Sequence, residues 1–343
     1  MKPETLKDVA KQLNLSVSTV SRVVNGKGYV KEETRQRVLE CLKTSNYVPN
    51  EIARSLKARE SMTIGVIVPD LREVYFGRII KQIDLTVSAA GYMLLVADTN
   101  ESRTVERRYL DVMFQKRVDA LVVSTVDMEN PNVHRYLSGG IPVIFIDNMP
   151  RSVQEGLHYV MVDNHQGSRL AVQTLVEHGH RDIAMIVGSL EEPTGYERKE
   201  GFCRAMEQHG LTAEPALIVQ GNFKTDGGYR CMKQLLRQRS EHPFTAVYVT
   251  SEMMTIGALR AIREEGLAVG SDISVIGFDV HDDLGLATPT IATVRQPEEQ
   301  VGQTVGKMLL QLLNPQKYGE AGNTQIWIEA ALQPGSSVLR LPE

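Results

Sequence analysis

The stretch that decides how the chain begins to fold is Thr5–Asn25, TLKDVAKQLNLSVSTVSRVVN. Thr5 and Asp8 have the spacing of a capping box, and the acid suits the positive end of a helix dipole. The apolar residues that follow fall on one helical face: Leu6, Val9, Ala10 and Leu13. We therefore expect a short helix that begins after Thr5.

A second helix should follow at once. Asn14-Leu15-Ser16 interrupts the first pattern with turn-forming residues, and Ser16 is placed to cap the next helix. Its buried side holds three valines, Val20, Val23 and Val24. The opposite side holds Val17, Ser18, Ser21, Arg22 and Asn25. Small hydroxyls, one arginine and one asparagine suit the major groove of DNA, where they meet base edges and phosphates.

The pattern T-L-x-D-V-A…V-S-x-x-T-V-S-R-V-V-N closely resembles the headpiece of the LacI/GalR family of bacterial transcription regulators, and the resemblance continues along nearly the whole chain. It implies that the residues in or before the second helix contact DNA. Those residues are Thr5, Ser16, Val17, Ser18, Thr19, Ser21, Arg22 and Asn25. The alternative is a helical hairpin that serves only as scaffold.

Composition places the chain among ordinary globular proteins. It has 343 residues, 42% hydrophobic and 23% charged, enough for two or three domains. Neither a run of about 18 apolar residues nor a signal sequence is visible, so we expect a cytoplasmic protein with no membrane partner. Cys41, Cys203 and Cys231 are scattered, which argues against a disulfide framework and against a zinc site.

Charge is unevenly distributed. Residues 1–60 contain 12 Lys and Arg against 7 Asp and Glu, a net charge of +5, whereas the remainder contains 26 against 35, a net charge of −9. A basic arm on an acidic body indicates a polyanionic partner for the arm alone. A solvated basic surface would explain the charge but not its coincidence with the two helices.

A third helix is expected over residues 31–45, with Val38, Leu39 and Leu42 facing inward. Members of the family usually have a hydroxyl cap where Lys31 stands, so the start of this helix should be weak. Glu32 and its neighbour Glu33 still suit the positive end of the dipole.

The segment YVPNEIARSLKARES, residues 47–61, follows. Asn50 can cap a helix over 51–59, which is too short to be stable alone, so the segment should be disordered until it is bound. The resemblance implies a hinge helix that enters the minor groove with Leu56 as its wedge. The DNA contacts it implies here are Asn50, Ala53, Arg54, Leu56 and Lys57. Alternatively, the segment is a linker whose Leu56 packs on the next domain.

From Met62 onward strands alternate with helices, which predicts parallel sheets. The predicted strands are 63–68, 93–98, 120–124, 143–146, 158–162, 183–187, 216–220, 246–249, 274–277, a short strand near 292 and 325–328. The predicted helices are 76–90, 103–116, 132–137, 164–178, 196–209, 225–239, 254–265 and a long one through Leu313. The first and second rounds resemble each other, since TIGVIVPDL is matched by DIAMIVGSL.

These patterns predict an α/β core of two doubly wound parallel-sheet subdomains behind a three-helix headpiece. By resemblance the core is of the periplasmic-binding-protein type, and its last elements cross back between the subdomains as a hinge. We expect a headpiece over 1–46, a hinge segment over 47–61 and a core over 62–343. The first subdomain should comprise about 62–155 plus 292–322, and the second about 156–291 plus 323–343.

Doubly wound sheets bind ligands beyond the carboxyl ends of their strands. The polar and aromatic residues at such ends, which match effector-contacting positions of the family, are Asp70, Tyr75, Phe76, Asp147, Arg198, Phe223, Ser251 and Asp279. Carboxylates and a guanidinium bind hydroxyls, and aromatic faces stack on a sugar or purine ring. A sugar-like effector is the leading expectation. Tyr75-Phe76 leaves a purine-type ligand open, and Glu252 departs from the shorter aspartate that the family commonly has.

Other chemistry is weakly indicated. Gly179, in His178-Gly179-His180, is placed to end a helix, and no third metal ligand is near in sequence, so we expect neither a metal nor a cofactor. Glycine pairs such as Gly227-Gly228 lack the context of a phosphate-binding loop. No catalytic triad is visible in the sequence, although triads are spatial.

The function expected from these features is that of a homodimeric, sequence-specific DNA-binding transcriptional repressor, not an enzyme. It should bind a near-palindromic operator under the control of a small polar effector. The alternatives are a regulator that responds to a nucleobase, a nucleoside or a phosphorylated partner protein, a cytoplasmic α/β carbohydrate-active enzyme, and a transport-type solute binder. Neither of the last two needs a basic helix-turn-helix.

Overall fold

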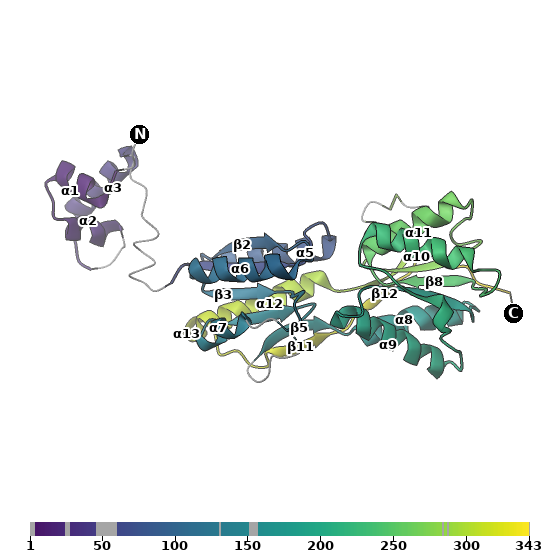
Figure 1. Cartoon of the computed structure of the whole chain (residues 1–343). Helices are drawn as coiled ribbons and strands as arrows, with labels where there is room; N and C mark the ends of the chain where they lie inside the picture. The colour runs from purple at the N-terminus through teal and green to yellow at the C-terminus, as the bar shows by residue number, and fades with distance from the viewer. Residues whose placement is uncertain are drawn as a thin grey trace. The chain divides into compact units, whose positions relative to one another are not determined.

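The computed structural model describes residues 4–24, 28–45, 60–129, 132–150, 157–282, 285–286 and 288–342. The chain divides into two compact units, Met1–Ser61 and Met62–Glu343 (Figure 1). The predicted hinge helix over 51–59 lies outside the described residues. So do six of the residues assigned to DNA contact: Asn25, Asn50, Ala53, Arg54, Leu56 and Lys57.

The headpiece begins with the two predicted helices. In α1 (Leu6–Leu13) the capping box is complete, because the Thr5 amide donates to Asp8 Oδ2 over 2.9 Å and the Asp8 amide donates to Thr5 Oγ1 over 3.4 Å. Asn14, at φ 53°, ends the helix in the left-handed conformation. Ser16 Oγ accepts from the Thr19 amide over 3.1 Å and starts α2 (Val17–Val24). The predicted caps are therefore confirmed.

The third helix, α3 (Glu32–Thr44), closes this small core. Lys31 makes no side-chain capping bond, as its departure from the family pattern predicted. Val38 is fully buried, but the prediction that Leu39 faces inward is wrong, since 38% of it is exposed. Residues three and four positions after Val38 share its face, and these are Cys41 and Leu42, which pack on the core instead.

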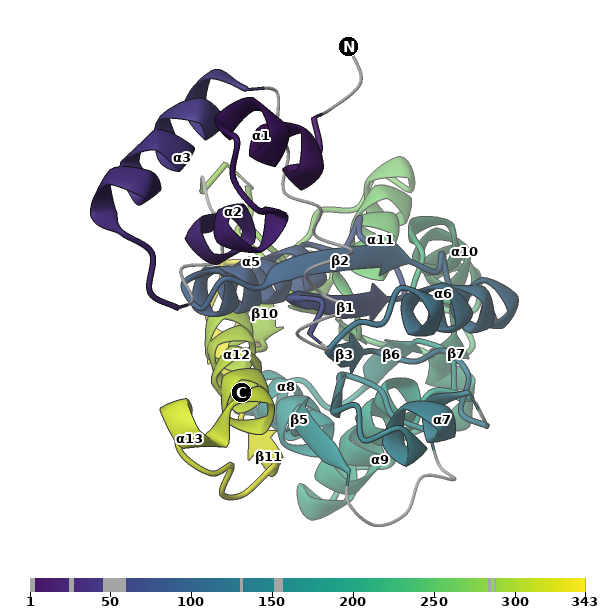
Figure 2. The same cartoon turned by 90° about the vertical axis from the view of Figure 1, so that its left-hand side faces the viewer.

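The first sheet of the core has the strand order β11-β5-β4-β3-β1-β2 and is parallel throughout. In Figure 2 the labels β2, β1, β3, β5 and β11 follow one another down the picture in this order. The strands are β1 (Thr63–Val68), β2 (Met93–Asp98), β3 (Ala120–Val123), β4 (Val143–Ile146), β5 (His158–Val162) and β11 (Gln325–Ile328). The buried clusters place α5 (Val74–Ser88) and α12 (Glu298–Leu313) on one face, and α6 (Arg103–Gln115) and α7 (Val133–Ser138) on the other.

The second sheet has the order β12-β10-β9-β8-β6-β7, and only β12 runs antiparallel to its neighbour. Its strands are β6 (Ile183–Val187), β7 (Ile218–Gln220), β8 (Ala246–Val249), β9 (Ser274–Phe278), β10 (Ala292–Arg295) and β12 (Ala331–Gln333). The pair α8 (Asn164–Glu177) and α9 (Pro193–Gln208) covers one face, and the pair α10 (Thr225–Arg237) and α11 (Glu252–Glu264) covers the other (Figure 1). Short 3-10 and α-helical turns, η1 (Pro215–Leu217) and α13 (Pro315–Tyr318), complete the core.

The predicted exchange points between the subdomains need correction. Both β5 and β11 belong to the first sheet, and β10 belongs to the second, the reverse of their predicted assignments. Periodicity predicts that a strand exists but not which strand it pairs with. In the described part of the chain the backbone passes between the sheets at Asp163, at Gln296–Pro297 and at Glu329–Ala330.

Three helices begin two or three residues earlier than predicted. These are α5, α9 and α11, which start at Val74, Pro193 and Glu252. For α11 the reason is visible, because Ser251 Oγ accepts from the Met254 amide over 3.2 Å and caps the helix. The earlier starts place Tyr75, Phe76 and Arg198 within the first two turns, directed at the ends of the strands.

The remaining sequence features have structural roles. Gly179, at φ 92°, ends α8 as predicted, and His180 is buried, with Nδ1 2.8 Å from Thr245 Oγ1. The three cysteines are free thiols. Within the described ranges, no helix is long and apolar enough to cross a membrane, and no cluster of three metal-ligating side chains is found.

Candidate functional site

The exposed face of α2 carries the predicted DNA contacts that the structure describes. Val17 is 42% exposed, and Ser18 and Arg22 are also exposed, whereas Thr19 and Ser21 are half-buried. Ser16 Oγ lies 2.8 Å from the hydroxyls of both Ser18 and Thr19, so it organises the first turn. The Thr5 hydroxyl donates to Asp8 over 2.7 Å and acts as a cap. The exposed part of α2 therefore presents hydroxyls and one guanidinium to solvent.

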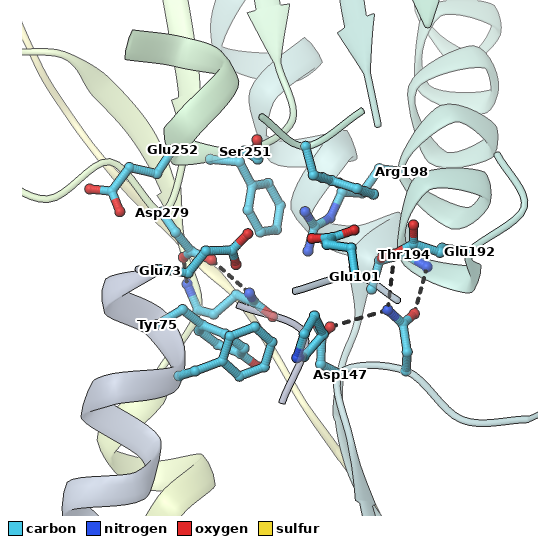
Figure 3. Close-up of a pocket in the computed structure, with 16 residues that line it drawn as sticks. Glu73, Tyr75, Glu101, Asp147, Glu192, Thr194, Arg198, Ser251, Glu252 and Asp279 are labelled. Carbon is cyan, nitrogen blue, oxygen red and sulfur yellow. Dashed lines mark hydrogen bonds between the residues drawn. The ribbon is translucent and has the colours of Figure 1, made fainter. Parts of the chain in front are cut away.

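A cavity of about 50 Å³ lies in the core where strands of both sheets end. By general packing arguments a volume of this size holds about four water molecules. Seven of the eight predicted effector residues line it: Tyr75, Phe76, Asp147, Arg198, Phe223, Ser251 and Asp279. Figure 3 labels five of them, Tyr75, Asp147, Arg198, Ser251 and Asp279, whose side chains converge from the two subdomains.

Asp70 is the exception. It is 5% exposed but does not line the cavity. Both of its carboxylate oxygens accept from Arg72, over distances of 2.5 to 3.0 Å. These hydrogen bonds, with the charge of Arg72, lower the pKa of Asp70. The residue shapes the turn after β1, so it is not among the side chains that a ligand in the cavity would meet.

The backbone turns sharply at several strand ends to aim side chains into the cavity. Asp147, Phe223 and Asp279 have φ values of 60°, 59° and 54°, and Glu101 has 62°. This left-handed conformation is uncommon for residues other than glycine, and such strain concentrates at binding sites. Each of the four lines the cavity. The strained residues thus lie at the junctions between the strands and the loops that line the cavity.

Arg198 organises the wall formed by the second subdomain. Its guanidinium donates from Nε to Asn164 Oδ1 and from Nη1 to the Thr250 carbonyl, each over 2.8 Å. It also stacks 3.7 Å above the centre of the Phe278 ring. With 5% of its surface exposed, it provides a buried positive charge among carboxylates.

The carboxylates of the cavity are difficult to ionise. Burial raises the pKa of Asp279 to about 6, although Gln296 partly offsets this by donating from its amide over 2.8 Å and from Nε2 over 2.6 Å. Burial, followed by the charges of Glu101 and Asp147, raises the pKa of Glu192 to about 8. Burial also raises the pKa of Asp147, against the opposing charge of Arg198. The site therefore gathers carboxyl groups whose ionised forms are disfavoured unless a donor or a positive charge accompanies them.

Glu252 has a cationic partner, His281. His281 contacts it through Nδ1 over 3.2 Å and through its backbone amide over 3.0 Å. The other ring nitrogen lies 2.8 Å from Glu298 Oε1, at the start of α12 in the first subdomain, where Arg295 also donates over 3.2 Å. Burial lowers the pKa of His281, but the hydrogen bonds to the two glutamates outweigh it and raise the pKa to about 9. A charged imidazole thus bridges α11 and α12.

Direct contacts across the cleft hold the subdomains in their present relation. Asn148 donates to Glu192 Oε2 over 3.5 Å and accepts from the Thr194 amide over 3.3 Å (Figure 3). At the rim, Arg103 and Glu191 form an exposed ion pair of 3.0 Å. An occupant of the cleft therefore lies among groups that already couple its two walls.

The sequence analysis missed several polar cavity residues. They are Glu73, Glu101, Asn148, Glu192, Thr194 and Gln296. A signal was present, because each follows a strand end or begins the next helix, the same rule that found the others. Glu252, noted as a departure from the family pattern, also lines the cavity.

Gly188 makes room for Phe223. A Cβ atom on Gly188 would lie 2.0 Å from Cζ of the Phe223 ring. Gly188→Ala should therefore displace this ring and weaken binding of a cavity ligand by at least about tenfold, the effect of losing about 1.4 kcal/mol of contact. Titration of any ligand found to bind the parent protein measures this change.

The matched control is Gly77→Ala, since an added Cβ at Gly77 meets nothing within 4 Å and helix propensity favours alanine. Equal ligand affinity of Gly188→Ala and the parent would contradict the role given to the Phe223 ring.

A helix-turn-helix unit joined to a two-sheet core with a polar cleft defines a class of protein, the DNA-binding transcriptional regulator with an effector-binding domain. Comparison with known families agrees with this architecture. Residues 5–50 match the description "Bacterial regulatory proteins, lacI family", and residues 61–332 match "Periplasmic binding proteins and sugar binding domain of LacI family". The chain belongs to the LacI family.

Individual relatives support the same assignment. The HTH-type transcriptional repressor PurR of Erwinia tasmaniensis is 38% identical over 311 residues, 89% of each chain, and that of Escherichia fergusonii is 38% identical over 310 residues, again 89% of each. The structure also resembles the lac repressor dimer bound to operator and the anti-inducer ONPF, with a TM-score of 0.83 and 27% identity over 98% of this chain and 100% of that one. The CelR–cellobiose complex gives a TM-score of 0.73 and 28% identity over 97% and 99% of the two chains.

Proposed function

We propose that this LacI-family regulator acts in the cytoplasm as a homodimeric repressor whose affinity for a near-palindromic operator is set by a small polar effector in the cleft. The observation that carries the proposal is the convergence of Tyr75, Asp147, Arg198, Phe223 and Asp279 on one cavity between the subdomains. These groups are suited to binding, and the proposed activity is a change in DNA affinity, not catalysis.

The lining suits a ring with polar substituents. Asp147, Asp279 and Arg198 provide charged hydrogen-bonding groups, which suit the hydroxyls of a sugar. A nucleobase is the second candidate, favoured by the aromatic side chains of Tyr75, Phe76 and Phe223 in the same cavity. Both candidates are compact, as the cavity requires.

Side-chain contacts between the subdomains can couple ligand binding to DNA binding. The bridge from Glu252 through His281 to Glu298 and the contact of Asn148 with Thr194 both join the two subdomains beside the cavity. A ligand that binds one relative position of the subdomains better than another shifts the equilibrium between them. In this proposal, that shift alters how the paired headpieces present α2 to the two halves of the operator.

The DNA side of the proposal is tested at Leu56, the predicted wedge in the hinge segment. Leu56→Ala should weaken specific operator binding by a few kcal/mol, roughly the scale of unstacking a base step. Non-specific binding should hardly change, because it depends on the lysines and arginines that neutralise phosphates. An operator selected from random duplexes, titrated beside an unrelated duplex at one salt concentration, provides both affinities.

Thermal denaturation of the same variant separates the alternatives. If Leu56 only packs a linker on the core, the variant should lose thermal stability and keep the parent's ratio of specific to non-specific affinity. That ratio, unchanged, would count against the wedge. A parent protein that selects no duplex at all would refute the repressor proposal itself.

The outer edge of the first sheet supports the homodimer. The edge strand β2 exposes Met93 (71%), Leu95 (38%) and Val96 (36%), and Leu85 of α5, the helix that packs against β2, is 53% exposed. Unpaired edge strands with exposed apolar side chains readily associate. We therefore place the dimer contact of the first subdomain at β2 and α5.

Replacing both Met93 and Leu95 by Glu should convert the dimer to a monomer, because charges on one face of the edge strand would be buried against their copies. Sedimentation velocity measures the state, and operator titration should show a loss of full-site affinity. Leu339→Glu, at a residue of similar exposure (40%) in the second subdomain, is the control and should remain dimeric. If the double variant remains dimeric, the interface does not lie at β2 and α5.

A further inference from the structure

The charges of the cavity are unbalanced, which bears on the kind of ligand that the proposed function requires. The cavity is lined by six carboxyl groups, those of Glu73, Glu101, Asp147, Glu192, Glu252 and Asp279. Arg198 is the one basic residue in the lining formed by the described part of the chain. An anionic ligand would add further negative charge to this group of carboxyls, whereas a ligand that donates hydrogen bonds would stabilise their ionised forms.

The guanidinium of Arg198 is already engaged. Two of its three nitrogens donate to Asn164 and Thr250, and its face covers Phe278. His281 neutralises Glu252 from outside the cavity, and Gln296 occupies both oxygens of Asp279. The internal donors are thus committed to these groups.

Three glutamates of the cavity accept few hydrogen bonds from the described part of the protein. No hydrogen bond to the carboxylates of Glu73 and Glu101 is found among the described residues, and Glu192 accepts only from Asn148 over 3.5 Å and from Ser189. Burial, followed by the charges of Asp147 and Glu101, raises the pKa of Glu73 well above its usual range, and burial raises that of Glu101 against the opposing charge of Lys224. A ligand that donates N–H groups would therefore stabilise the ionised forms of these three glutamates, which the protein itself stabilises little.

Two hydroxyl groups in the cavity wall, those of Tyr75 and Thr194, also indicate a ligand that forms hydrogen bonds. Tyr75 is 5% exposed and Thr194 is 4% exposed, and both line the cavity. Neither side-chain oxygen has a hydrogen-bond partner within the described ranges. Hydroxyls at a cavity wall with no partner in the protein can bond to a ligand in the cavity.

We infer that the effector is a compact ring carrying an amino nitrogen, whose N–H groups are accepted by Glu73, Glu101 and Glu192 while Tyr75, Phe76 and Phe223 contact the ring. This inference rests on the proposed function and narrows it. Amino sugars and amino-substituted heteroaromatic bases share the required chemistry. A carboxylated or phosphorylated ring would place like charges together, at a cost that an acidic, partly desolvated site makes severe.

Matched probes distinguish the two sources. In the sugar arm glucosamine is compared with glucose and glucuronate, and in the base arm adenine is compared with hypoxanthine, each by calorimetry and thermal shift on the full-length protein. In the arm that corresponds to the effector, the amino member should bind at least about tenfold more tightly than its hydroxyl or oxo counterpart, because charge-assisted hydrogen bonds are the strong ones.

Glu192→Gln removes one acceptor charge while keeping the size of the side chain, and it should reduce that preference by about tenfold. Glu200→Gln is the matched control, because Glu200 lies on the same helix, outside the cavity, and pairs with Arg204. The control should keep the parent's preference. The test variant should fold, because burial and the neighbouring carboxylates raise the pKa of Glu192 to about 8, so its ionised form does not stabilise the folded protein.

Each other outcome overturns the inference. Tighter binding of glucose, glucuronate or hypoxanthine than of the amino counterpart would reject the amino ligand, and so would the absence of binding by both amino probes. An unchanged preference in Glu192→Gln would reject the role of the glutamates. Selection of an operator by the parent protein is measured separately, so failure of the proposed function is distinguishable from failure of this inference.

Discussion

Arg198→Ala is expected to abolish the effector response and to lower the free energy of unfolding by about 3 kcal/mol, because it removes the basic side chain that lines a buried set of carboxyl groups. The substitution leaves Asn164 Oδ1 and the Thr250 carbonyl without their donor and exposes the face of Phe278. Denaturant unfolding measures the stability change, and effector-dependent operator titration measures the response. Operator affinity without effector should remain close to that of the parent.

Arg204→Ala is the matched control for this experiment. Arg204 lies two turns further along α9, is 62% exposed at its side chain and pairs with Glu200 at the surface. Surface pairs contribute roughly 0 to 1 kcal/mol, so the control should be nearly neutral. A parental effector titration in Arg198→Ala would refute the assignment of this residue to the site.

His281 should make the protein less stable in alkali. Its pKa in the folded protein, about 9, lies above the unfolded value near 6.5, so the bridge contributes fully below pH about 6.5 and is lost as the pH rises through about 9. A shift of this size corresponds to roughly 3 kcal/mol at the low-pH limit. The charged groups facing the imidazole are Glu252 from α11, Glu298 from α12 and Arg295 from β10.

His281→Gln should flatten this pH dependence in denaturant titrations at pH values from about 6 to 10. It should also weaken the coupling between subdomains, because Glu252 and Glu298 would then be buried without a shared cation. His242→Gln is the control, since His242 pairs with Glu214 at a site where the side chains are 35% and 46% exposed. Equal pH profiles for His281→Gln and the parent would show that the bridge does not contribute to stability.

Local rules predicted most of the elements but not their partners. Alternation and capping residues placed eleven strands and the headpiece helices, since those signals are contained within a few neighbouring positions. The short strand β12 gave no such signal, because Ala331–Gln333 carries no periodicity and is held by its antiparallel pairing with β10. The assignment of β5 to the wrong sheet had the same origin, since pairing is decided by contacts distant in sequence.

The site was predicted through one rule applied incompletely. The carboxyl ends of the strands suggested Asp147, Phe223 and Asp279, and the structure brings all three to one cavity. Asp70 satisfied the same rule, but its carboxylate pairs with Arg72 and does not line the cavity. The position of Asp70 after a strand does not reveal this pairing. Glu101 and Glu192 follow strand ends in the same way but were not predicted as site residues. Glutamates in exposed loops are common, and these two become buried only when the cleft forms.

The three crossovers also govern how the chain can be made. The edge strand β11 pairs with β5, and Gln325 lies opposite Tyr159. The first sheet therefore cannot be completed until about 160 further residues have been synthesised after β5. Until then, the growing chain exposes the flank of β5 and the apolar face that α12 covers. Nascent chains ending before about residue 320 should therefore bind chaperones, and loss of the last twenty residues should damage both halves of the core at once.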